Sequence, residues 1–102
     1  MVQGGSETRL SKEALLHDVI RILEDITSDW DLEFSGGINH DTRLIADLAF
    51  ESIDVVEFVV AIEGQFMRRD LPFEKLLMVD GRYVDDLHVA EVVDFLHEHL
   101  KS

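Results

Sequence analysis

Three stretches of this chain place apolar residues at steps of three and four, which is the spacing of one face of an α-helix. The strongest is 52–66, whose apolar stripe consists of Val55, Phe58, Val59, Ile62 and Phe66. A second helix is expected to begin after Ser11, a suitable N-cap, and to end near Thr27, and a third is expected over 89–100. No stretch alternates convincingly with period two, so the sequence predicts an all-α fold, a small bundle with one or two further short helices.

A long loop is expected between the first two main helices, over 28–50, where no helical period is sustained. A loop of this length is unusual in a compact domain unless it packs on the helices or has a function. Its apolar residues are therefore expected to fold onto the helices: Trp30, Leu32, Phe34, Ile38, Leu44, Ile45 and Leu48.

The ends and the second half of the chain complete the expected organisation. Residues 1–10 are mostly polar and are expected to form a flexible N-terminal tail, which leaves 11–102 as one domain. Pro72 is expected to separate the preceding helix from the next element. Residues 73–79 are expected to form a short helix that ends at the Asp80-Gly81 turn. Residues 83–87 are expected to add another helical turn.

The net charge of -13, from 22 acidic and 9 basic residues, limits the partners of the chain. Nucleic acids and anionic membranes both select basic surfaces, so we expect neither, and partners should present basic patches. Cysteine is absent, which excludes disulfides, thiolate metal sites and a cysteine nucleophile. With no long apolar run and no secretory signal in 1–10, we expect a cytoplasmic monomer.

Two features that suggest metal binding fail on their spacing, so we expect no metal. Acidic residues alternate from Asp29, as at the start of a calcium-binding EF-hand loop, but Phe34 and His40 occupy the sixth and twelfth places. An EF-hand needs Gly and Glu there. His97 and His99 are two residues apart, so on a helix they point roughly 200° apart and cannot easily share a metal.

Ser52 stands at the start of the strongest apolar helix. Taken alone, a serine in this place is usually a helix cap. The surrounding segment, however, resembles the acyl carrier protein family around its 4'-phosphopantetheine attachment site, an Asp-Leu-Gly-x-Asp-Ser-Leu-Asp run that continues into a helix. The segment reads Asp47-Leu48-Ala49-Phe50-Glu51-Ser52-Ile53-Asp54-Val55-Val56-Glu57.

The resemblance covers most of 11–100. Residues 41–48 are similar to the family's approach to the site, Leu71-Pro72 to the turn after its second helix, and 89–96 to the start of its last helix. The chain departs from the family at Ala49, where Gly is usual, and at Glu51, where Asp is usual. Residues 71–87 are also longer than in fatty-acid carriers.

The resemblance implies a four-helix carrier fold and a function without catalysis of its own. A phosphopantetheinyl transferase would move 4'-phosphopantetheine from coenzyme A onto the Ser52 hydroxyl, and the thiol of this arm would hold an acyl or aminoacyl group as a thioester. Acyltransferases, ketosynthases or adenylation-type enzymes with basic docking patches would be the partners. Fatty acid, polyketide and nonribosomal-peptide pathways all remain open.

Around Ser52 the resemblance assigns a partner-binding role to Glu51, Asp54 and Glu57, which would meet Arg and Lys on partner enzymes. Ile53 and Val60 would either join this face or pack under the long loop, and Val56 is expected to be buried. The alternative function is a non-enzymatic acidic helical adaptor that binds basic partner proteins and carries no prosthetic group.

Overall fold

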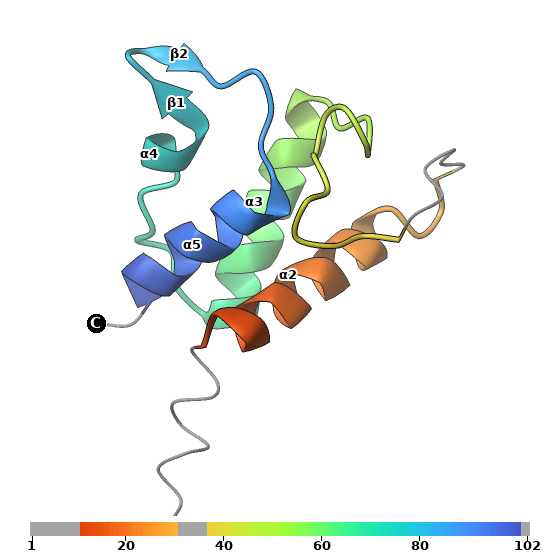
Figure 1. The fold of residues 1–102 in the computed structure, drawn as a ribbon. Helices are drawn as coiled ribbons and strands as arrows, with labels where there is room; N and C mark the ends of the chain where they lie inside the picture. Colours follow the sequence, from red (N-terminus) through yellow and green to blue (C-terminus); the bar gives the residue numbers. More distant parts are fainter. Residues whose placement is uncertain (1–10, 31–36, 101–102) are drawn as a thin grey trace, which may run out of the picture.

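The computed structural model in Figure 1 describes residues 11–30 and 37–100 of the chain. In this part of the chain the structure is mostly helical, with one small antiparallel sheet. The elements follow in the order α2 (Lys12–Ile26), α3 (Ser52–Phe66), α4 (Glu74–Leu77), β1 (Met78–Val79), β2 (Arg82–Tyr83) and α5 (Val89–Leu100).

The three long helices lie where the apolar periodicity predicts them. At the start of α2, the Ser11 hydroxyl accepts a hydrogen bond from the backbone N–H of Ala14 at 3.1 Å, which confirms the predicted N-cap. At its end, both the backbone N–H and the hydroxyl of Thr27 donate to the Leu23 carbonyl. The helix is therefore fixed at both ends by local hydrogen bonds.

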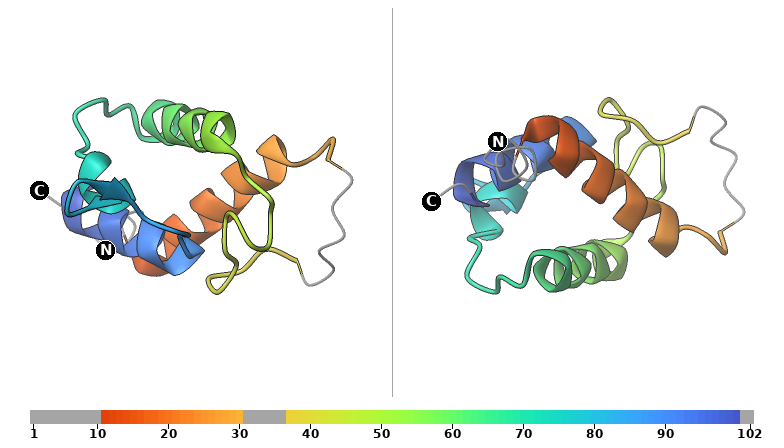
Figure 2. Two further views of the ribbon diagram at one scale, coloured as in Figure 1. Left: turned by 90° about the horizontal axis from the view of Figure 1, so that it is seen from above. Right: turned by 90° about the horizontal axis from the view of Figure 1, so that it is seen from below.

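The core lies between the three long helices. Helix α2 packs against both α5 and α3, and the two views of Figure 2 show α2 and α5 side by side with α3 across from them. The α3 stripe faces this core as predicted, with Phe58 and Ile62 buried and the other three members half-buried against it. The most fully buried large side chains are Leu15, Val19, Leu23, Leu44, Leu48, Ile62, Val89, Val92 and Leu96.

The prediction that the long loop folds onto the helices is confirmed for most of its apolar residues. Leu44 and Leu48 are buried, and Trp30 and Ile38 are half-buried against the core. Ile45 contradicts the prediction, because 43% of its surface is exposed. Leu32 and Phe34 lie outside the described residues.

The segment 73–87 differs from the all-α prediction. The short helix ends at Leu77, and the chain then forms a two-stranded hairpin in which Met78 pairs with Tyr83 and Val79 with Arg82. Asp80 and Gly81 both have positive φ, 54° and 79°, as a two-residue hairpin turn requires. The Asp-Gly pair therefore connects two strands, and the helical turn expected over 83–87 is wrong. Figure 1 shows the hairpin on the side of α5 away from α2.

The longest described helices, α2 and α3, have 15 residues each. At 1.5 Å per residue such a helix extends about 22 Å, whereas the hydrocarbon core of a bilayer is about 30 Å thick. None of the helices in 11–30 and 37–100 combines the length and the apolar character needed to cross a membrane.

Candidate functional site

Ser52 is the first residue of α3 and is exposed. The chain approaches it through a tight turn, in which the Phe50 N–H donates to the Leu44 carbonyl at 3.0 Å and Ala49 has a positive φ of 58°. Phe50 is buried, and its ring contacts those of Trp30 and Phe58 at centroid distances of 5.4 and 6.3 Å. This buried ring anchors the chain two residues before Ser52.

The cap of α3 is Glu51, and Ser52 does not cap the helix. Glu51 and Asp54 form a capping box, in which the Asp54 carboxylate accepts the backbone N–H of Glu51 at 2.8 Å. The Ser52 hydroxyl makes no hydrogen bond within 11–30 and 37–100. The interpretation of this serine as a cap is therefore wrong, and its hydroxyl is exposed at the positive end of the helix dipole.

A groove of about 520 Å³ opens beside Ser52. Its walls come from the turn before α3, from the first turns of α3 itself, and from the segment that runs from α4 through the hairpin towards α5. Most of the side chains that line it are apolar. The lining residues are Leu44, Ile45, Phe50, Glu51, Ser52, Val55, Val56, Leu77, Tyr83, Val84, Asp86 and Leu87.

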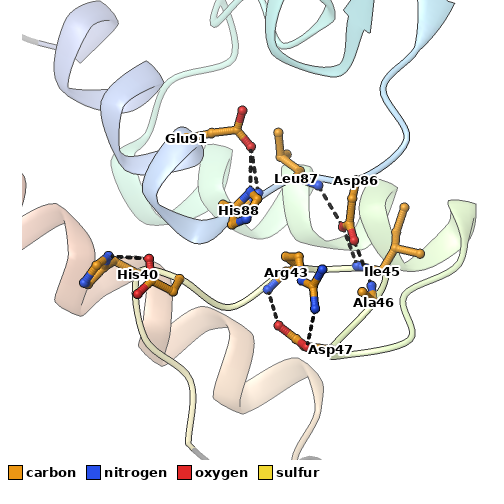
Figure 3. A network of polar contacts seen from close by, with 10 residues as sticks. His40, Arg43, Ile45, Ala46, Asp47, Asp86, Leu87, His88 and Glu91 are labelled. Carbon is orange, nitrogen blue, oxygen red and sulfur yellow. Dashed lines mark hydrogen bonds and ion pairs between the residues drawn. The ribbon is translucent and has the colours of Figure 1, made fainter.

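Asp86 connects two walls of this groove, as Figure 3 shows. Its carboxylate accepts the backbone N–H groups of Ile45 and Ala46, each at 2.9 Å, and that of Leu87 at 2.8 Å. Partial burial raises the pKa of Asp86, but these three donors and the nearby Arg43 guanidinium outweigh it and hold the pKa below its ordinary value. The carboxylate is therefore ionised at neutral pH.

A second carboxylate closes the turn that carries Ile45. Asp47 accepts the backbone N–H of Arg43 at 2.8 Å, and its other oxygen lies 3.5 Å from the Arg43 guanidinium (Figure 3). The hydrogen bond from the Arg43 N–H is the main cause that holds the pKa of Asp47 below its ordinary value, against the opposing effect of partial burial.

The residues predicted to bind partners differ in how exposed their side chains are. Glu51 and Glu57 are exposed, whereas Asp54 is half-buried and has one carboxylate oxygen engaged in the capping box. Ile53 and Val60 are 68% and 60% exposed, so they do not pack under the long loop. Val56 is 56% exposed, and the expectation that it is buried is wrong, because α3 is covered only on its Phe58–Ile62 side.

The structure groups these residues in two sets. Glu51, Ser52 and Val56 line the groove. Ile53, Glu57 and Val60 lie along α3 at a spacing of four and three residues, which places them on one exposed strip outside the groove. This strip exposes one acidic and two apolar side chains.

Sequence reasoning missed the groove walls that lie beyond α3. Nothing in the local pattern relates Ile45 to Tyr83 or Asp86, because these residues meet only through the tertiary fold. The Asp80-Gly81 pair was the available signal, since Asp-Gly is favoured in two-residue hairpin turns and a hairpin here pairs Tyr83 with Met78, next to α4.

The histidines show no cluster suited to a metal. His40 lies 3.2 Å from the Asp41 carboxylate, His88 lies 3.4 Å from that of Glu91, and the His99 ring packs on Phe95. Within the described ranges, no three His, Asp or Glu side chains are arranged to hold a metal ion. Most of the acidic stretch after Asp29 lies outside the described residues.

Comparison with known proteins gives no match: no protein-family model, no curated protein and no solved structure is similar to this chain.

Proposed function

We propose that this chain is an acyl carrier protein that carries acyl or aminoacyl groups as thioesters on a 4'-phosphopantetheine arm attached to Ser52. The observation that carries the proposal is the state of Ser52. Ser52 is exposed and is the first residue of the apolar helix α3. Its hydroxyl makes no hydrogen bond to any other group in the described part of the chain. A transferase can therefore reach the hydroxyl without breaking an internal hydrogen bond.

The position of Ser52 also suits a phosphodiester. A phosphate attached to the first residue of a helix lies near unpaired backbone N–H groups and the positive end of the dipole. Glu51 and Asp54 already fix the start of α3, so the serine side chain is left for attachment. When bound, the arm supplies a thiol for thioester chemistry, which this cysteine-free chain cannot supply itself.

The proposed fold is a four-helix carrier fold with an extended second half. Helices α2, α3, α4 and α5 would be the four helices, and the hairpin between α4 and α5 would be the extension. We propose that the chain acts as a cytoplasmic monomer, in fatty acid, polyketide or related biosynthesis.

The exposed strip of α3 is the proposed docking face for the transferase and for acyltransferase, ketosynthase or adenylation-type enzymes. Glu57 on this strip, with Glu51 beside Ser52, would meet basic residues of these partners, and Ile53 and Val60 would add apolar contacts. Charges of this kind mainly steer encounter and orientation, so partner binding should weaken as salt rises.

The test is modification in vitro with a broad-specificity phosphopantetheinyl transferase, magnesium and coenzyme A, followed by mass spectrometry. The wild-type chain should gain one phosphopantetheine. Ser52→Ala should gain none and keep the helical circular dichroism spectrum of the wild type. Ser28→Ala, which changes another exposed serine, is the matched control and should be modified like the wild type.

An unmodified wild-type chain with several transferases would overturn the carrier proposal. Salt-sensitive binding of basic proteins by that same unmodified chain would then favour the acidic adaptor.

A further inference from the structure

The groove beside Ser52 is assembled from parts of the chain that have little direct packing between them. The hairpin packs mainly on α4, and α4 in turn packs on α5. The groove itself lies between the hairpin segment and the first turns of α3. The relative position of these walls must therefore be fixed by specific bonds.

Hydrogen bonds between 86–90 and 40–46 supply this link: the Val89 and Ala90 N–H groups donate to the Thr42 and His40 carbonyls, each at 2.9 Å, and the bonds at the groove itself are those of Asp86 and Leu87. The Leu87 carbonyl accepts the Leu44 N–H at 3.0 Å, and the Asp86 side chain accepts the next two backbone N–H groups, those of Ile45 and Ala46. The Ile45 and Asp86 partners are 41 residues apart in the sequence. Among the described residues, Asp86 is the side chain that ties the hairpin side of the groove to the turn before α3.

The chemistry of this contact requires a carboxylate. Two oxygens accept three N–H groups, and the third donor, from Leu87, orients the side chain against its own backbone. An amide has only one accepting oxygen and would direct its NH₂ group at one of the donors. The Leu87 contact is part-buried, so losing its acceptor is costly, whereas the exposed Ile45 and Ala46 N–H groups can bond water instead and the link between the two segments is then lost.

We propose that Asp86 is a positioning residue that holds the groove beside Ser52 in its open, preformed shape. It acts through the turn before α3. Asp86 and Leu87 are hydrogen-bonded to residues 44–46, and the Leu44 carbonyl in this segment accepts the N–H of Phe50. Asp86, which lies 34 residues after Ser52 in the sequence, thus fixes the width of the groove and the path of the chain into Ser52. The relevance of the groove to Ser52 rests on the proposed carrier function, but the positioning role of Asp86 is tested on the unmodified chain.

The first measurement is amide hydrogen exchange in Asp86→Asn. Exchange at Ile45 and Ala46 should accelerate about tenfold or more, because one of their acceptors is lost and the other is weakened. Asp85→Asn is the matched control, because it removes the same charge from the neighbouring position. Asp85 is exposed and makes no hydrogen bond among the described residues. It should leave exchange at both positions unchanged.

The second measurement is binding of Nile red, a neutral apolar dye that the net charge of the chain does not repel. Ile45→Glu, which places a charge in the groove, should abolish binding, whereas Ile53→Glu, which lies outside it, should not. This pair establishes that the dye reports the groove. Asp86→Asn should then weaken binding at least threefold, and Asp85→Asn should not.

A third variant separates positioning from stability in general. Val92→Ala removes buried volume from α5, away from the groove, and destabilises the fold without touching Asp86. Under conditions where Val92→Ala and Asp86→Asn are both folded by circular dichroism, only Asp86→Asn should lose dye affinity. Equal affinities in Asp86→Asn and Asp85→Asn, or equal losses in Asp86→Asn and Val92→Ala, would overturn the proposal. Neither result bears on whether Ser52 is modified, so failure of this inference is distinct from failure of the carrier function.

Discussion

Ala49 offers a direct test of how the chain is led into α3. It is a non-glycine residue with φ of 58°, three residues before Ser52, and its side chain is exposed. Its N–H donates to the Ile45 carbonyl at 3.0 Å, so the turn requires this backbone conformation. The change Ala49→Gly keeps the hydrogen bond and removes only the methyl group.

The expected effect is the difference between two backbone terms. The left-handed conformation costs a residue with a side chain about 1–2 kcal/mol, which glycine does not incur. Glycine loses more conformational freedom on folding, which costs about 0.4–1 kcal/mol relative to alanine. No buried contact is lost, since Ala49 is exposed. Ala49→Gly should therefore stabilise the fold by about 0.5–1 kcal/mol, which for a chain of this size raises Tm by roughly 2–5 °C.

Thermal unfolding followed by circular dichroism measures this change. Ala61→Gly is the control: it makes the same substitution inside α3, where helical φ gives glycine no advantage, and because Ala61 is half-buried against the core, destabilisation of about 1 kcal/mol or more is expected. If Ala49→Gly lowers Tm as Ala61→Gly does, the turn before Ser52 does not hold Ala49 in the left-handed region.

Two further predictions concern the acidic contacts and the hairpin. The pKa values of Asp47 and Asp86 are lower in the folded chain than the ordinary value of 3.8, so their stabilisation is present above that value and is lost as pH falls through the folded values. The urea midpoint should therefore fall as the pH is lowered through and below 3.8, and it should fall less steeply in Asp86→Asn; identical slopes would contradict this. Gly81→Ala should lower Tm because Gly81 has φ of 79°, although an added methyl group would meet no neighbour within 4 Å. An unchanged Tm and an intact NMR signature of the Met78–Tyr83 pairing would refute a backbone origin of this cost.

The long helices could be predicted from the sequence because their signals are local. The stripe that contains Phe58 and Ile62, and the cap at Ser11, each involve residues only a turn or two apart. Ser52 was singled out through the family resemblance, and the structure has this serine exposed at the start of its helix.

The groove and the hairpin could not be predicted in the same way. The contact between Asp86 and Ile45 depends on how the segment between the hairpin and α5 passes the turn before α3, and no local pattern encodes it. Val56 was misplaced because apolar character alone does not say which side of a helix another element covers. Glu51 was expected to bind partners, and its place as the cap of α3 was not predicted, although a glutamate before a helix whose third residue is Asp54 can form a capping box.

The capping box at the start of α3 has a consequence for any chemistry at Ser52. A helix whose start depended on the serine hydroxyl would lose its first turn whenever that oxygen was esterified. Here the helix start is maintained by Glu51 and Asp54, so a group can be attached to Ser52 or removed from it with no change in the bonds that begin the helix. If Ser52 carries the proposed arm, attaching or removing it would leave the hydrogen bonds of the capping box in place, and the attached group itself would be what distinguishes the two forms of the chain.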